Sequence, residues 1–118
     1  VEADKAEIQP VIDTLESLEV SDRQGFMAVL RSIHHILARS SKNEFILSSI
    51  KTTQGLSRRF WCYYATDDDQ TYCTDLYIRQ MKALMEEDRD TALAASSELI
   101  NYLQNFTKKQ MDQFNSEH

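Results

Sequence analysis

The sequence predicts an all-α fold, a compact antiparallel bundle of five to six helices. Only 2 of the 118 residues are Gly and 1 is Pro, whereas an all-β fold needs many turns built from such residues. Apolar residues also recur at spacings of three and four along most of the chain, which is typical of amphipathic helices. The length suits one domain. We therefore expect a single helical domain over residues 1–118, with fraying at 1–7 and 115–118.

The first two helices are predicted from apolar stripes and capping signals. Ile8, Val11 and Leu15 form one stripe, and Pro10 is tolerated only in a first helical turn. The first helix is therefore expected from about residue 9 to 19. Residues 21–24 then read as a capping box, with a Ser hydroxyl followed three positions later by a Gln amide. A second helix should run from there to about residue 40.

Further capping signals divide the rest of the chain. Residues 41–44 predict a third helix that ends before Gly55, and Ser57 predicts a short fourth helix through Ala65. The run 67–69, three Asp residues, should break that helix, and one of them should cap a fifth helix that runs to about residue 85. Asp88 or Asp90 should cap a long last helix. Its apolar face is expected to comprise Leu93, Ser97, Ile100, Leu103, Phe106, Met111 and Phe114.

The two cysteines predict a disulfide. Cys62 and Cys73 lie at symmetric positions about the Asp loop, so their Cβ atoms would face each other if the two helices folded back as a hairpin. A disulfide favours an exported protein, periplasmic or secreted, with its signal peptide removed. The alternative is two free thiols and a cytoplasmic protein.

The same hairpin gathers six of the eleven aromatic residues within residues 60–77. The aromatic residues of one short helix cannot all point inward, because successive side chains turn by about 100°. The helix is therefore either a central strut or an exposed aromatic patch beside an acidic loop, the usual anatomy of a protein-binding hot spot. The second reading predicts a partner-binding surface. Its residues are Trp61, Tyr63, Tyr64, Asp67, Asp68, Asp69 and Tyr72.

One short segment of this hairpin resembles a known family. Tyr63-Tyr64 followed by Asp67-Asp68-Asp69 is similar to the Tyr-Tyr and acidic segment of the small helical immunity proteins that neutralise nuclease colicins. The flanking sequence, the length and the cysteine pair depart from that family. The resemblance implies an acidic helical inhibitor of another protein.

Charge is segregated along the chain. Residues 1–22 carry a net charge of −6 and residues 23–59 a net charge of +6. Either the acidic first helix lies beside the basic second helix, or one of the two patches steers a partner.

No recognisable catalytic constellation is present, so we expect no enzyme. Gly25 and Gly55 are too far apart for a phosphate loop, and the Asp run lacks the alternate acids of a calcium loop. His34 and His35 point about 100° apart on a helix, so we expect one at the core edge and the other on the surface, with no metal site and no cofactor. The overall acidity argues against nucleic acid, and no apolar run approaches the roughly 20 residues of a membrane span.

These observations predict an exported protein-binding module, an inhibitor, immunity or accessory protein that blocks or holds another protein. Two alternatives remain open. One is a helical carrier of a hydrophobic small molecule, lined by Met residues. The other is a structural homo-oligomer, in which the last helix pairs with a copy of itself as a homodimer.

Overall fold

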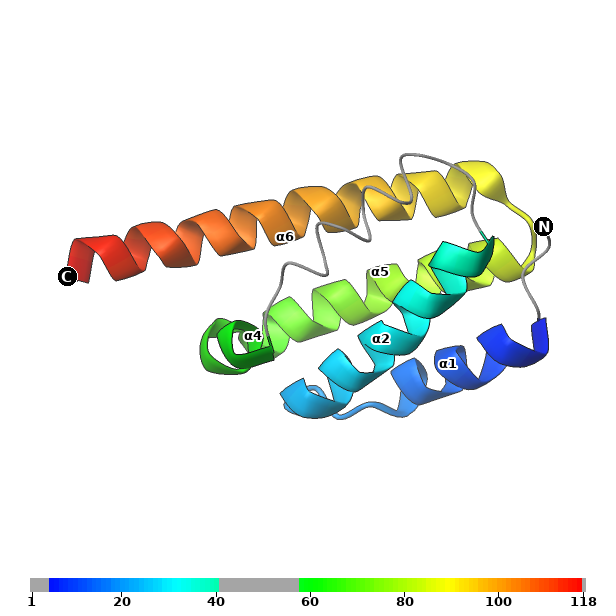
Figure 1. Ribbon diagram of the computed structural model, residues 1–118, viewed down its shortest axis with the longest axis horizontal. Coiled ribbons are helices and arrows are strands. Elements are labelled where there is room, and N and C mark those ends of the chain that lie inside the picture. Colours follow the sequence, from blue (N-terminus) through cyan, green and yellow to red (C-terminus); the bar gives the residue numbers. More distant parts are fainter. Residues whose placement is uncertain (1–4, 41–57, 118) are drawn as a thin grey trace.

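The computed structural model describes residues 5–40 and 58–117. This part of the chain contains five α-helices and no strand, which confirms the all-α prediction (Figure 1). The helices are α1 (Lys5–Ser17), α2 (Arg23–Ser40), α4 (Arg58–Tyr64), α5 (Asp67–Met85) and α6 (Arg89–Glu117). The helix predicted between residues 41 and 55 lies outside the described residues. The prediction of a single domain over 1–118 stays a prediction.

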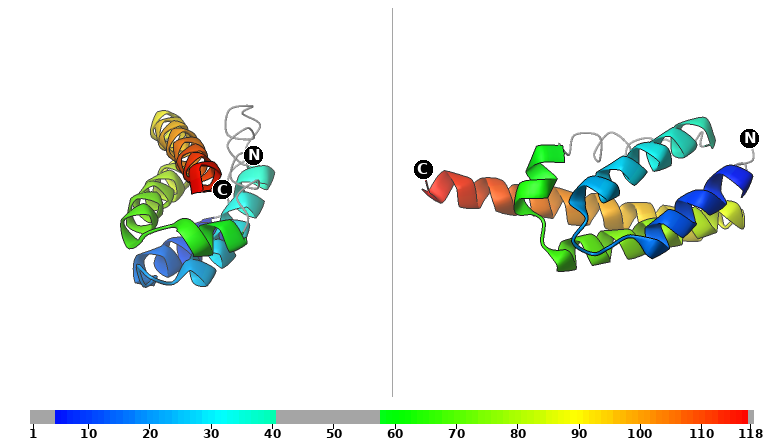
Figure 2. Two further views of the ribbon diagram at one scale, coloured as in Figure 1. Left: turned by 90° about the vertical axis from the view of Figure 1, so that its left-hand side faces the viewer. Right: turned by 90° about the horizontal axis from the view of Figure 1, so that it is seen from below.

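The bundle is built on a long antiparallel pair. Helices α5 and α6 run side by side in opposite directions, α1 packs along α5, and α2 packs against both α1 and α5 (Figure 1). Helix α4 lies across one end of the bundle, where it packs against α2 (Figure 2). The longest dimension of the molecule is 48 Å, close to the ~44 Å that a rise of ~1.5 Å per residue gives for α6.

Helix α1 begins earlier than predicted. Pro10 lies inside the helix that begins at Lys5, so the expected start near residue 9 was wrong. Pro10 removes one backbone hydrogen bond near the helix end, where few bonds are at stake. Ile8 compensates, because its side chain is fully buried in the core. Tertiary packing therefore extends the helix beyond the proline.

Helix α2 is capped by Asp22 and not by Ser21. The Asp22 carboxylate accepts a hydrogen bond from the backbone N–H of Gly25 at 2.8 Å. A Cβ atom at Gly25 would collide with that carboxylate, so glycine is the residue that lets the cap approach this closely. The predicted start of α2 is nevertheless within two residues of the observed one.

Helix α5 begins with a capping box that also places the Asp run inside the helix. The Thr66 hydroxyl accepts from the Asp69 N–H at 3.1 Å, and the Asp69 carboxylate accepts from the Thr66 N–H at 2.9 Å. The predicted Asp cap was therefore wrong by one residue. Asp67, Asp68 and Asp69 occupy the first turn, where their negative charges interact favourably with the helix macrodipole.

The turn between α5 and α6 follows the Schellman pattern. The N–H of Asp88 donates to the Ala83 carbonyl at 2.8 Å, and the N–H of Glu87 donates to the Leu84 carbonyl at 3.3 Å. Glu87 adopts a left-handed φ of 59°. Asp88 then caps α6, as predicted, by accepting from the Thr91 N–H and hydroxyl. These hydrogen bonds lower the pKa of the Asp88 carboxyl below its ordinary value.

The face that α6 buries differs from the predicted one over its first half. Ala92, Ala95, Ser96 and Leu99 are buried, whereas Leu93, Ser97 and Ile100 are only half-buried. Small side chains face α5 here, so the buried stripe is rotated toward alanine and serine. Leu103 and Phe106 are buried as predicted.

The predicted disulfide is absent: Cys62 and Cys73 are free thiols. The prediction assumed that α4 folds back along α5 as a hairpin, but α4 crosses the end of α5 (Figure 2). Cys62 is consequently exposed on α4, and Cys73 is buried in the core on α5. Burial raises the pKa of the Cys73 thiol to about 12, and the negative charge of Asp69 adds to the shift.

Candidate functional site

The predicted aromatic surface is divided between core and solvent. Trp61 is fully buried, with its ring stacked on Phe26 at a centroid distance of 5.0 Å and tilted against Phe106 at 5.1 Å. Its side chain therefore cannot contact a partner. Tyr63, by contrast, is 78% exposed. Tyr64 is half-buried against Phe60, at a centroid distance of 4.9 Å.

The acidic members of that surface make contacts within the chain. Asp67 forms an ion pair of 2.8 Å with Arg23, and Asp69 accepts a hydrogen bond from the Tyr102 hydroxyl. Tyr102 also stacks on the half-exposed Tyr72 at 4.4 Å. Burial, with this bond to Asp69, raises the pKa of the Tyr102 hydroxyl above its ordinary value.

Asp68 is exposed in the same helical turn of α5. Apart from Trp61, the predicted surface residues are at least partly accessible. Their role in binding a partner stays a prediction.

Gln70 is a buried glutamine whose amide is fully used. Its Nε2 donates to the carbonyls of Glu19 at 3.1 Å and Asp22 at 3.0 Å. Its Oε1 accepts from the Trp61 indole N–H at 3.3 Å. One side chain on α5 thus fixes α4 and the turn between α1 and α2. Gln70 is structural, because both amide N–H groups and the amide carbonyl are bonded within the protein.

Gln80 is a second buried glutamine, one whose amide is only partly used. Its Nε2 donates to the Ser96 hydroxyl of α6 at 2.6 Å. Its Oε1 is buried with no hydrogen-bond partner among the described residues. A buried acceptor in that state costs about 1–3 kcal/mol, and such groups are rare in native proteins.

Tyr77 extends this polar region by one helical turn. Its side chain is buried and meets Phe26 of α2 edge-on at 6.0 Å. Tyr77, Gln80 and Ser96 are hereafter the interior polar group. It brings hydroxyl and amide functions into the largely apolar interior of the bundle, which makes it our candidate site.

The two histidines separate as their helical spacing predicts. His34 is half-buried and His35 is exposed. Burial lowers the pKa of the His34 imidazole below its ordinary value. Within residues 5–40 and 58–117, no group of three or more His, Cys, Asp or Glu side chains is arranged to hold a metal ion.

These features define a class: a helical bundle domain that carries hydrogen-bonding groups in its interior, the kind of place where helical proteins hold small molecules. The sequence model of the FCD domain family matches residues 2–102. The chain therefore belongs to the FCD domain family. FCD domains are C-terminal ligand-binding domains of GntR-family transcription regulators. No curated protein and no solved structure matches the chain.

Family membership corrects the predicted function, location and partners. FCD domains of GntR regulators are cytoplasmic and regulatory, so the predictions of an exported inhibitor or immunity protein and of a periplasmic or secreted location were wrong. GntR-family regulators bind small-molecule effectors, and they bind DNA through a partner domain, which contradicts the predictions of a protein partner and of no nucleic acid. GntR-type regulators are not enzymes. None of the described helices is both long and apolar enough to cross a membrane.

The sequence reasoning missed Gln70, Gln80 and Ser96. Each lies in the apolar register of its helix: Gln80 follows Tyr77 by three residues, and Ser96 precedes Leu99 by three. A polar residue within an apolar stripe was therefore the available signal.

Proposed function

We propose that this chain is the effector-sensing domain of a GntR-family transcription regulator, and that it binds a small molecule at the interior polar group. The FCD match over residues 2–102 supports the regulatory role. The observation that supports the position is the buried Oε1 of Gln80, which has no partner among the described residues. On this proposal the chain itself performs no catalysis, because it only senses its ligand.

The chemistry of the site favours a ligand that carries a hydroxyl or N–H donor. Such a donor would satisfy the Gln80 carbonyl, and the ligand would thereby offset the desolvation cost of that buried acceptor. The surroundings are apolar, with Met81 and Leu99 fully buried nearby in sequence on the same two helices. A charged group at this depth would pay a large desolvation cost, so the donor should be neutral.

Ligand occupancy would act on α6, since Gln80 holds that helix through Ser96. A ligand that competes for the Gln80 amide would alter the hydrogen bond between α5 and α6. A two-state change follows only if the ligand binds one arrangement of the helices more tightly than the other. The DNA-binding domain would then respond to the position of these helices.

The test is a thermal-shift screen of the chain against neutral hydroxylated and amide-containing metabolites, compared between wild type and Gln80→Met. A ligand present at about 100 times its Kd stabilises the folded state by about 2.7 kcal/mol. We expect that stabilisation in the wild type and its loss in Gln80→Met. The matched control is Gln104→Met, the same substitution at an exposed position of α6. Ligands that stabilise all three proteins equally would refute the assignment of the site to Gln80.

A further inference from the structure

A cavity lies apart from the interior polar group, between two other helices. It is a groove of about 350 Å³ between α1 and α2, within the size range of small-molecule pockets. Its walls are contributed by both helices. The lining residues are Glu7, Val11, Arg31, Ser32, His35 and Ile36.

The α2 wall of this groove is cationic and rich in hydrogen-bond donors. Arg31 and His35 are four residues apart on one helix, so their side chains lie on the same face, and Ser32 adds a hydroxyl beside them. Both Arg31 and His35 are exposed. Among the described residues, no ion pair involves Arg31. Its guanidinium therefore keeps its donors available for a carboxylate.

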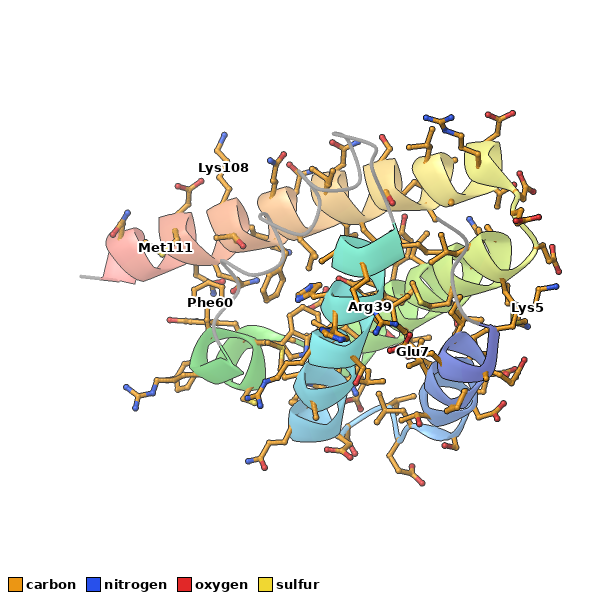
Figure 3. The ribbon with its side chains drawn as sticks, turned by 45° about the vertical axis from the view of Figure 1, so that its right-hand side comes forward. Lys5, Glu7, Arg39, Phe60, Lys108 and Met111 are labelled. Atoms are coloured by element: carbon orange, nitrogen blue, oxygen red, sulfur yellow. The ribbon has the colours of Figure 1, made fainter. Side chains whose placement is uncertain are left out.

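Glu7 is the only acid among the described lining residues of the groove, and it is already paired. Glu7 of α1 accepts from the Arg39 guanidinium of α2, and the two side chains point toward each other in Figure 3. Arg39 compensates the charge of Glu7, whereas Arg31 has no acidic partner among the residues that the structure describes. Electrostatics in the groove consequently favour an anion over a cation or a neutral ligand.

The floor of the groove is apolar. Val11 is 8% exposed and Ile36 is 2% exposed, so each presents only a small hydrocarbon surface to the groove. A hydrated inorganic ion would gain little from that floor, whereas a hydrocarbon group would bury apolar area against it.

We propose that the groove between α1 and α2 is a binding site for a small monocarboxylate with an apolar body. Its carboxylate pairs with the Arg31 guanidinium in the bidentate geometry that arginine favours. Ser32 and His35 flank that pair, and the apolar body lies against Val11 and Ile36. The site is separate from the interior polar group and does not depend on the function proposed there.

The test is a titration of the isotope-labelled chain with sodium benzoate, followed by two-dimensional amide NMR at constant ionic strength. Saturable shifts are expected for residues 7–11 of α1 and 31–36 of α2. Arg31→Gln should raise the Kd for benzoate at least about tenfold, because a charge-assisted hydrogen bond is lost. The matched control is Arg89→Gln, which removes the same charge at the exposed start of α6. It should leave the Kd within about twofold of the wild type, as expected for a charge outside the groove.

Three results would overturn the proposal: no saturable shift, equal affinity in Arg31→Gln, or inorganic phosphate bound as tightly as benzoate. The last result would reveal a plain anion site. The amide spectrum itself reports whether Arg31→Gln is folded. Gln80→Met should leave benzoate binding unchanged, so failure of the groove and failure of the interior site can be told apart.

Discussion

Gln70 and Gln80 lie ten residues apart on α5, and the same substitution should change stability in opposite directions at the two positions. Both side chains are 1% exposed, and methionine matches glutamine closely in length and volume. The difference between them is hydrogen bonding. The amide of Gln70 makes three hydrogen bonds, whereas that of Gln80 makes one and leaves its Oε1 without a partner among the described residues.

For Gln80→Met, the lost bond to Ser96 costs about 0.5–1.5 kcal/mol, and removal of the orphaned carbonyl regains about 1–3 kcal/mol. The Ser96 hydroxyl can turn to a carbonyl of its own helix. We therefore expect the free energy of unfolding to rise by about 1 kcal/mol. For Gln70→Met, three hydrogen bonds are lost and the buried Trp61 N–H is left without an acceptor. The free energy of unfolding should therefore fall by about 3–5 kcal/mol.

Urea denaturation of the ligand-free chain, followed by circular dichroism, measures both changes through the shift of the midpoint at constant m-value. The exposed Gln104→Met variant sets the baseline and should lie within about 0.5 kcal/mol of the wild type. A loss of more than about 1 kcal/mol in Gln80→Met would mean that its carbonyl is satisfied in the unliganded protein. The argument for a ligand at this carbonyl would then fail.

Three further predictions concern the turn, the thiols and the aromatic core. Glu87→Gly should stabilise the chain by about 0.5–1 kcal/mol in urea denaturation, because glycine adopts the left-handed φ of this position without the Cβ penalty; a loss of stability would contradict the Schellman assignment. Iodoacetamide at pH 8 should label Cys62 alone in the native protein and both thiols in urea, since burial raises the pKa of Cys73 to about 12. Mass spectrometry counts the labels. If neither cysteine is labelled in urea, the two are joined by a disulfide after all. Trp61→Ala should cost about 3–5 kcal/mol in thermal or urea unfolding, whereas Tyr63→Ala should stay within about 0.5 kcal/mol; comparable losses would show that Tyr63 also belongs to the core.

The helices could be predicted because their signals are local. Apolar spacing and the scarcity of Gly and Pro are properties of neighbouring residues, and they set the all-α class. The choice of cap was less predictable. Ser21 and Asp22, like Thr66 and Asp67, are adjacent residues of good capping types, and the backbone path decides which side chain reaches the free N–H groups.

The cysteines show where sequence symmetry misleads. Cys62 and Cys73 lie at nearly equal distances from the Asp run, five residues before it and four after it, but a disulfide also requires α4 to run back along α5. The direction of α4 is set by Trp61, which packs between Phe26 and Phe106 on two distant helices. Such long-range contacts are invisible to spacing alone. The prediction of export had relied on the disulfide, and the family match contradicts it.

The functional class was less accessible than the fold. Composition and spacing described an acidic helical bundle, and many unrelated functions share that description. The interior polar group was detectable in principle, because Gln80 and Ser96 interrupt apolar stripes. Its meaning depends on the unsatisfied Oε1, a fact of three-dimensional packing.

The length of helix α6 determines how far a small rotation near Ser96 moves the far end of the helix. It continues to Glu117, past the end of the family match at residue 102, as one rod from the interior polar group outward. The stretch from Ser96 to Glu117 is about 32 Å long at a rise of ~1.5 Å per residue. A pivot of about 5° at Ser96 would therefore displace the far end by roughly 3 Å. A hydrogen-bond rearrangement at Gln80 that tilts α6 would therefore be amplified along the helix. A small rotation at the site would produce a displacement of several ångströms at the C-terminal end of α6.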